Sequence, residues 1–484
     1  MTSQPLPSSS TTRPNTEKYS DPDPLAYEAQ VYQQGLRYQR PPFTFKPLEW
    51  EPLAAERMSA ETRGYVLGCA GTGESARKNR EAFGRWSIVP RRLELGGGMT
   101  SSPRGGGEEK DVGKKGDVFP RLSVRLFGRE QLLPFPIACA PVGVQKIMNP
   151  DGELATARAA ARERVPFILS TASSASIEDV ARANDSGVEQ EQEGGEKGNG
   201  NGKPKAERWF QLYWPAREHD DITASLLLRA KKAGYSVLVV TLDTSILGWK
   251  PGDMDNGYNP FLRSDQVGVA IGLSDPVFQA HFQRKHNGLS VTQKLGAAAA
   301  EWTRTIFPGT THALSDVAFL REHWDGPIVL KGIQSAADAR AIAASGLVDG
   351  VVVSNHGGRQ ADGAASSLGT LRGVARAVEA VNAETSGDGG QKGDSKKKRK
   401  VQVLFDSGIR SGVDVAKALA LGADMCLVGR PFVYGLVLGG EEGVAHVLRS
   451  LLGDLELTLH LSGIKSVGKE DLNESVLVKE DELF

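Results

Sequence analysis

The sequence predicts a single α/β domain built as a (β/α)₈, or TIM, barrel with a helical N-terminal extension and disordered insertions. From about residue 136 onward, eight apolar, strand-like runs alternate with helical patterns, and most of these patterns end near a glycine, as 221–234 and 412–422 do. An open doubly wound sheet is the alternative, but the glycine-rich fingerprint that would follow its first strand is missing. The predicted strands are 136–141, 166–170, 209–213, 236–242, 327–331, 349–354, 401–406 and 424–429.

The segments outside these units divide the rest of the chain. Residues 1–24 are rich in Ser, Thr and Pro and lack the apolar core of a secretory signal, so we expect a disordered tail. Residues 25–135 are expected to form a helical segment that leads into the barrel, which occupies 136–465. Residues 466–484 remain as a C-terminal tail.

Three low-complexity insertions interrupt this pattern at 95–117, 185–207 and 384–400, and their few aliphatic residues predict disorder. The second and third each join a helix to the next strand. In a barrel such connections lie on the face opposite the active site, so we expect both to leave the chemistry unaffected. The last insertion ends in Lys-Lys-Lys-Arg-Lys-Val at 396–401, which could be a nuclear import signal but is more typical of a solvated loop.

The long connection at 245–312 has a different position, because it leaves the carboxyl end of the fourth strand and therefore lies over the active face. Loops of this length often act as lids, and this one predicts a helical piece near 290–303.

The bulk properties exclude several classes of protein. The chain has 484 residues, with 58 Lys and Arg against 59 Asp and Glu, so nothing favours a nucleic-acid or anionic-membrane partner. No run of about 18 apolar residues predicts a membrane span. The three cysteines are far apart and lack metal-ligand spacing, so we expect no disulfide framework, no metal and a cytoplasmic location.

The most informative stretch is 351–363, Val-Val-Val-Ser-Asn-His-Gly-Gly-Arg-Gln-Ala-Asp-Gly. Its valines end a buried strand, and paired glycines then turn the chain and present His356 and Arg359 three residues apart. An imidazole can accept a proton, and a guanidinium can hold a carboxylate through two hydrogen bonds. The pair indicates oxidation of a small hydroxy acid. The alternative is a surface glycine turn with an unrelated histidine and arginine.

Each of the remaining predicted strands also ends in polar or glycine residues. In a barrel, all of these strand ends meet on one rim. Glycine turns after the last two strands, together with Arg410 and Arg430, are typical of a phosphate site. In chain order the strand-end candidates are Pro141, Val142, Gly143, Ser170, Gln211, Tyr213, Thr241, Asp243, Lys331, His356, Arg359, Asp406, Gly408, Arg410, Gly429 and Arg430.

With these residues the chain resembles the FMN-dependent 2-hydroxy-acid oxidising enzymes. The signature Ser-Asn-His-Gly-Gly-Arg-Gln carries the resemblance, which extends from about Tyr65 to Gly463 through Asn79-Arg-Glu-Ala-Phe83. Within the family the chain is most similar to the lactate 2-monooxygenases, in stretches such as Gly64-Tyr-Val-Leu-Gly68 and Phe405-Asp-Ser-Gly408. The resemblance implies FMN as the cofactor, a small 2-hydroxy acid and O₂ as substrates, and a homo-oligomer, either a tetramer or an octamer.

The resemblance also implies a role for each candidate. His356 would take a proton from the substrate, Asp243 would stabilise the imidazolium, and Lys331 would face the flavin ring near N1 and O2. Arg359 would bind the substrate carboxylate, and Tyr65 and Tyr213 would donate hydrogen bonds to the substrate. For Tyr65, Ser170 and Thr241, core packing or ordinary strand-end bonding remains an alternative. The residues implied in FMN binding are Pro141, Val142, Gly143, Ser170, Gln211, Thr241, Lys331, Asp406, Gly408, Arg410, Gly429 and Arg430.

One position departs from the family pattern, because Lys250 occupies the place of a second arginine after the fourth strand. Lysine keeps the charge but lacks the planar fork, at a cost of about 1.5–3 kcal/mol if a bidentate contact is lost.

The resemblance as a whole implies a lactate 2-monooxygenase reaction, with a plain oxidase releasing keto acid and H₂O₂ as one alternative. A catalytically weakened FMN-binding protein and a barrel that binds a phosphosugar without flavin are the others.

Overall fold

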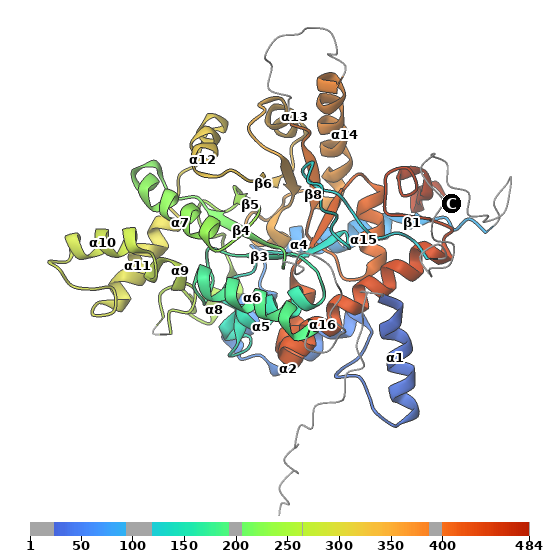
Figure 1. The fold of residues 1–484 in the computed structure, drawn as a ribbon, viewed down its shortest axis with the longest axis horizontal. Helices are drawn as coiled ribbons and strands as arrows, with labels where there is room; N and C mark the ends of the chain where they lie inside the picture. The colour runs from blue at the N-terminus through green and yellow to red at the C-terminus, as the bar shows by residue number, and fades with distance from the viewer. Residues whose placement is uncertain (1–23, 93–118, 193–205, 264, 387–398, 484) are drawn as a thin grey trace, which may run out of the picture.

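The computed structural model describes residues 24–92, 119–192, 206–263, 265–386 and 399–483 (Figure 1). The predicted disorder of the N-terminal tail and of the three insertions falls on residues that lie, apart from their flanks, outside these ranges. The first half of the basic run that ends the last insertion, residues 396–398, also lies outside them. At its near edge, Arg399 forms an ion pair with Asp349 at 2.9 Å.

Eight parallel strands form a closed barrel, which confirms the predicted fold (Figure 1). The strands pair in chain order, and β9 pairs with β2 to close the ring, for example through Ala138 opposite Leu427. Each strand coincides with one of the eight predicted runs. Their bounds are β2 Ile137–Cys139, β3 Phe167–Leu169, β4 Arg208–Tyr213, β5 Leu238–Thr241, β6 Ile328–Ile333, β7 Gly350–Val353, β8 Gln402–Phe405 and β9 Met425–Val428.

Helices follow each strand and surround the barrel (Figure 1). Two of them end as predicted, since Gly234 and Gly422 adopt the positive φ angles of +78° and +110° that helix-terminating glycines favour. The helices after the strands are α5 Gly152–Arg162, α6 Ile177–Gln192, α7 Asp220–Lys232, α12 Val317–His323, α13 Ala336–Ala344, α14 Ser367–Ser386, α15 Gly412–Ala420 and α16 Arg430–Leu461.

Two insertion boundaries differ from the prediction. The helix α6 continues to Gln192 and α14 to Ser386, so residues 185–192 and 384–386 are helical rather than part of the insertions. In α6 the physical reason is composition, because the Glu and Gln residues that make the segment look like low-complexity sequence are also good helix formers.

The barrel has two apolar layers, which follow from the alternation of side chains along each strand. Inward-facing residues such as Ile168, Trp209 and Val239 fill its interior, and Leu126 and Leu133 pack against them from the segment before β2. The alternate residues of the same strands, such as Phe210 and Leu212, face the helices and belong to the larger outer core.

The connection between β5 and β6 is more structured than its sequence predicts. It contains α8 Pro251–Asp255, α9 Ala270–Leu273, α10 Pro276–Lys285 and α11 Leu295–Ile306, where only one helical piece near 290–303 was expected. Pro at the first helical position starts two of these short helices, which hydrophobic periodicity does not reveal. Two of these helices, α10 and α11, contact each other through the buried rings of Phe278 and Trp302, whose centres lie 5.2 Å apart.

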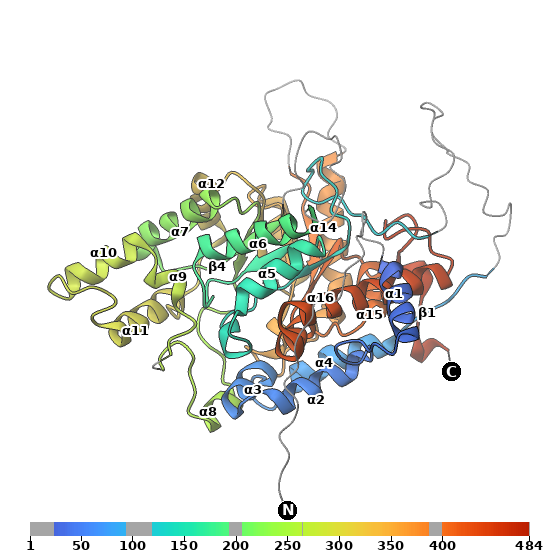
Figure 2. The same cartoon turned by 60° about the horizontal axis from the view of Figure 1, so that its bottom comes forward.

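The two ends of the described chain also pack onto the barrel. The helices α2 Pro47–Arg57, α3 Ala60–Leu67 and α4 Glu74–Glu81 lie along one end of the molecule together with α8 (Figure 2), while α1 spans Pro24–Leu36. The residues after 466, expected only as a tail, contain β10 Leu477–Lys479, which pairs antiparallel with β1 Trp86–Ile88. No helix in the described ranges is long and apolar enough to cross a membrane.

Candidate active site

The site begins where the inward-facing positions of the strands change from apolar to polar. Because side chains alternate, the residue two positions after an interior residue also faces inward. Val239 is thus followed by Thr241, and Val329 by Lys331. On four other strands, the position two residues after an interior residue is also polar; these residues are Ser170, Gln211, Ser354 and Asp406. Two positions further along the chain, Tyr213 follows Gln211 and Asp243 follows Thr241.

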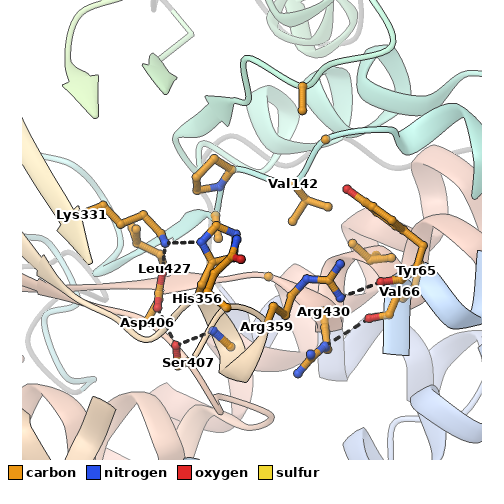
Figure 3. A pocket seen from close by; sticks show the side chains of 18 of the residues that line it. Tyr65, Val66, Val142, Lys331, His356, Arg359, Asp406, Ser407, Leu427 and Arg430 are labelled. Atoms are coloured by element: carbon orange, nitrogen blue, oxygen red, sulfur yellow. Dashed lines mark hydrogen bonds and ion pairs between the residues drawn. The ribbon is translucent and has the colours of Figure 1, made fainter. Parts of the chain in front are cut away.

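A cavity opens above this polar layer, with an empty volume of about 1070 Å³ counted out to the solvent at its mouth. His356, Arg359 and Lys331 all line it, so the structure brings these three predicted residues together (Figure 3). The other predicted residues that line the cavity are Tyr65, Pro141, Val142, Gly143, Tyr213, Lys250, Asp406, Gly408, Arg410, Gly429 and Arg430.

Three charged or titratable groups form the centre of the site. The Nδ1 atom of His356 lies 2.7 Å from Oδ1 of Asp243, and Nζ of Lys331 lies 3.2 Å from Oδ2 of the same carboxylate. The carboxylate therefore accepts from both neighbours and holds the proton of the imidazole on Nδ1. The other ring nitrogen, Nε2, is then the atom of His356 that can accept a proton in the cavity.

Burial and charge together set the protonation states of this cluster. Burial alone would raise the pKa of Asp243, but Lys331 and His356 hold it below its ordinary value. Burial likewise opposes the charge on Lys331, yet Asp243 and Asp406 raise its pKa. The pKa of His356 is lowered by burial and by the Lys331 ammonium 3.4 Å away, and Asp243 only partly offsets both effects. His356 is therefore neutral, and able to act as a base, at neutral pH.

The loop that carries His356 is held by a helix from the N-terminal segment. The amide side chains of Asn79, on α4, and Asn355 donate hydrogen bonds to each other, at 2.7 and 2.9 Å. Asn355 also accepts from the backbone N–H of Gly358 at 3.1 Å. The sequence patterns included Asn355 and Asn79 only within matching stretches and gave neither a role, because a buried amide pair has no pattern of its own along the chain.

Arg359 is fixed by the same N-terminal segment. Its Nη1 atom donates to the backbone oxygens of Tyr65 and Gly68, at 2.6 and 2.8 Å, and its guanidinium lies 5.0 Å from the centre of the Tyr65 ring. Burial raises the pKa of Tyr65 to about 12, so its hydroxyl remains protonated and can donate a hydrogen bond. Burial also raises the pKa of Tyr213.

Lys250 lies at the start of α8 and lines the cavity with only 9% of its surface exposed. Burial and the nearby Arg359 lower its pKa to about 7, against the opposing effect of Asp253. Unlike the arginine it replaces, this group can lose its charge in the physiological range.

Four predicted residues do not line the cavity. Asp243 acts on it through His356 and Lys331. Gln211 donates from Nε2 to Thr241 at 2.9 Å, and Ser170 accepts from the backbone N–H of Ala172 at 3.2 Å. The hydrogen bonds of Gln211, Thr241 and Ser170 are those of ordinary strand ends, which was the alternative considered for Ser170 and Thr241.

The part of the cavity beside Arg359 has the features of an anion site, and Arg359 and Arg430 both donate to the backbone oxygen of Gly68. Arg430 begins α16 and Arg410 follows the glycine turn after β8, so two guanidinium groups meet the positive end of the first part of α16, which is kinked at Gly439 and Gly440. Gly408 in that turn has φ of +93°, and a Cβ there would lie 2.6 Å from the backbone oxygen of Asn79. Only glycine fits this close approach.

No sequence pattern predicted the apolar side of the cavity. Leu247, Phe261 and Phe307 come from the connection between β5 and β6 and line the cavity beside Tyr213. The ring of Phe307 lies 4.9 Å from that of Tyr213 and 5.5 Å from that of Phe261. These residues surround the reacting region with apolar surface.

Comparisons with known proteins agree with this geometry. Residues 116–479 match the family model described as FMN-dependent dehydrogenase. An FMN-dependent alpha-hydroxy acid dehydrogenase of Schizosaccharomyces pombe is 50% identical over 459 residues, covering 95% of this chain and 97% of that protein. An L-lactate oxidase of Lysinibacillus sphaericus is 34% identical, covering 91% and 94%. The crystal structure of a mandelate oxidase has a TM-score of 0.66 at 30% identity, covering 90% of this chain and 99% of that one.

Proposed function

The chain belongs to the FMN-dependent dehydrogenase family of α-hydroxy-acid-oxidising enzymes, and from that premise we propose that its substrate is L-lactate or a similarly small L-2-hydroxy acid. We further propose that it follows the lactate 2-monooxygenase course, in which L-lactate and O₂ give acetate, CO₂ and water. The observation that carries the proposal is the convergence of His356, Arg359, Lys250 and Lys331 on one cavity.

The residues present fit FMN in two parts of the cavity. Arg410, Arg430 and the start of α16 supply donors for a phosphate, and Lys331 supplies a buried cation for the ring. When bound, FMN accepts the hydride equivalent removed from the substrate and passes the electrons to O₂.

His356 takes the proton that leaves the substrate. Its Nε2 atom is the free acceptor, and the imidazolium that forms is stabilised by Asp243 at 2.7 Å. Asp243 remains ionised because Lys331 and His356 lower its pKa. Lys331 thereby serves two groups, the carboxylate of Asp243 and the ring of the cofactor.

The substrate carboxylate is bound by two cations and oriented by hydroxyl groups. Arg359 is held in place through one of its nitrogens, Nη1, which leaves its other donors for the carboxylate. Lys250 adds a second charge, and the protonated hydroxyls of Tyr65 and Tyr213 line the same cavity and can donate hydrogen bonds.

The apolar side of the cavity supports a small acid with an apolar side chain. Leu247, Phe261 and Phe307 exclude water there, and retention of the keto acid beside them would favour its decarboxylation by peroxide. A plain oxidase that releases the keto acid and H₂O₂ is the second candidate, because a relative at 34% identity is named an L-lactate oxidase.

Product analysis tests the proposal. The full chain loaded with FMN is incubated aerobically with a panel of short L-2-hydroxy acids, including lactate, glycolate and mandelate. We expect acetate and CO₂ from L-lactate without accumulation of H₂O₂. Pyruvate with stoichiometric H₂O₂ would instead support the plain oxidase.

The flavin spectrum provides the control for weak activity. Under anaerobic conditions the substrate should bleach the absorbance of bound FMN near ~450 nm, and D-lactate should not. If no acid in the panel bleaches the flavin, the chain is an FMN-binding protein that has lost turnover, and the proposed function is wrong.

A further inference from the structure

We propose that Ser407 is a positioning residue that connects the loop of the catalytic base to the Asp406–Lys331 pair. The inference rests on the proposed function, since it concerns how His356 and Lys331 are placed toward the reacting atoms. Ser407 lines the cavity and is 8% exposed.

The backbone at Ser407 is unfavourable for a residue with a side chain. Its φ angle is +86°, in the left-handed region, and the next residue, Gly408, has φ of +93°. Glycine would adopt the conformation of Ser407 without strain. A residue other than glycine persists in such a conformation when the surrounding structure determines it, and such residues cluster at functional sites. His356 is a second cavity residue of this kind, with φ of +56°.

The hydroxyl of Ser407 explains why a side chain is retained there. It accepts a hydrogen bond from the backbone N–H of Gly357, at 2.9 Å, and donates one to Oδ1 of Asp406, at 2.7 Å (Figure 3). Gly357 directly follows His356 in the chain. The hydroxyl therefore joins the base loop after β7 to the strand end after β8.

These bonds complete a ring of contacts around the active centre. Asp406 lies 3.7 Å from Lys331, Lys331 lies 3.2 Å from Asp243, and Asp243 lies 2.7 Å from His356. The backbone from His356 to Gly357 and the hydroxyl of Ser407 return the ring to Asp406. Without the hydroxyl, Gly357 loses its acceptor, and Asp406 loses a donor and attracts Lys331 more strongly.

Loss of the hydroxyl should therefore change catalysis in a defined direction. Lys331 would move away from His356 and toward Asp406, which removes part of the charge that opposes protonation of His356. The fall of kcat/KM on the acidic side of its pH profile, called the acid limb below, should then occur at higher pH. We expect kcat to fall about 3- to 10-fold, the effect of one lost hydrogen bond, with KM changed less.

Two substitutions separate the hydroxyl from the strain. Ser407→Ala removes the hydroxyl and keeps the strained backbone, whereas Ser407→Gly removes both. Arg164→Gly is the matched control for relief of strain, because Arg164 has φ of +54° in the connection between α5 and β3, at the opposite end of the barrel.

The full FMN-loaded chains are compared by Tm, by kcat and KM across pH, and by the reduction potential of the bound flavin. We expect both Ser407 variants to lose kcat and to shift the acid limb, the glycine variant to have the higher Tm of the two, and Arg164→Gly to change Tm alone. Unchanged kcat, acid limb and potential in Ser407→Gly would overturn the proposal. If the wild-type chain oxidises no hydroxy acid, the proposed function fails, but the potential still decides the role of Ser407: a shift in both Ser407 variants supports it and no shift overturns it.

Discussion

The acid limb of the pH profile of activity depends on the protonation of a single residue, His356. Because burial and Lys331 lower its pKa below 6.5, the base is neutral over most of the physiological range and is lost only as pH falls through that lowered value. We expect kcat/KM on L-lactate to rise with pH through an apparent pKa below 6.5. His356→Gln should lower kcat/KM about 10²- to 10⁴-fold at every pH. Steady-state kinetics from pH 4.5 to 7 checks both.

Asp243 opposes the lowering of the His356 pKa, so removing the charge of Asp243 should lower that pKa further. In Asp243→Asn the attraction of the carboxylate is absent, and the acid limb should move to still lower pH while kcat falls. An acid limb that moves upward in this variant would contradict the assignment of the limb to His356.

Lys250 should produce an alkaline limb that an arginine would not. Its pKa is about 7, so the cation is present below that pH and is lost as pH rises through it. We expect kcat/KM to decline above about pH 7 through a rise in KM, and Lys250→Arg to extend the plateau to higher pH. Lys250→Met is the control and should have a high KM throughout. An identical decline in the wild type and in Lys250→Arg would show that another group titrates.

Residues such as Lys331 and His356 could be predicted because they end or follow strands, where a barrel collects its chemistry. The positions of Asn79, Thr244 and Ser407 could not. Thr244 donates to Asp243 at 2.7 Å, but a threonine beside an aspartate has no distinctive pattern. Their roles depend on contacts between segments far apart in the chain.

At the level of elements, α4 supports the base loop through the Asn79–Asn355 pair. Asn79→Ala removes two hydrogen bonds from the buried amide of Asn355, which keeps only its bonds to Gly358 and Ala365, and we expect a loss of about 1–3 kcal/mol in the free energy of unfolding. Denaturant titration measures this loss, and a double-mutant cycle with Asn355→Ala isolates the coupling. Additive effects of the two substitutions would show that the pair is not coupled.

The strands were predictable and the β5–β6 connection was not, for a physical reason. A buried parallel strand such as β5 is apolar on both faces and shows as a continuous run of valines and leucines. The short helices α8 and α9 bury few residues each and have no repeating apolar face. They are stable because they pack against other segments, α8 against α3 and α9 against α10 and α11.

The whole molecule combines the barrel with the segments that complete its site. The barrel alone supplies His356, Lys331 and the anion site, while Tyr65 comes from the N-terminal helices and Lys250 from the β5–β6 connection. The local pattern of α3 could predict a helix but not its place over the barrel. That placement depends on contacts such as the hydrogen bond from Ala70 to Gly358 at 2.9 Å.

The same architecture predicts which parts of the chain are dispensable. Residues 193–205 join α6 to β4, and 387–398 join α14 to β8, so both connections begin and end on the face of the barrel opposite the cavity. Replacing each with a short Gly-Ser linker should leave kcat/KM per bound FMN within about twofold, because no residue at the carboxyl ends of the strands is touched.

Shortening the β5–β6 connection at 256–306 should have the opposite effect. It removes Phe261 from the cavity wall and breaks the connection that carries Phe307, so turnover should fall even if FMN is retained. Equal losses from both kinds of deletion would mean that the two faces of the barrel are not functionally separate.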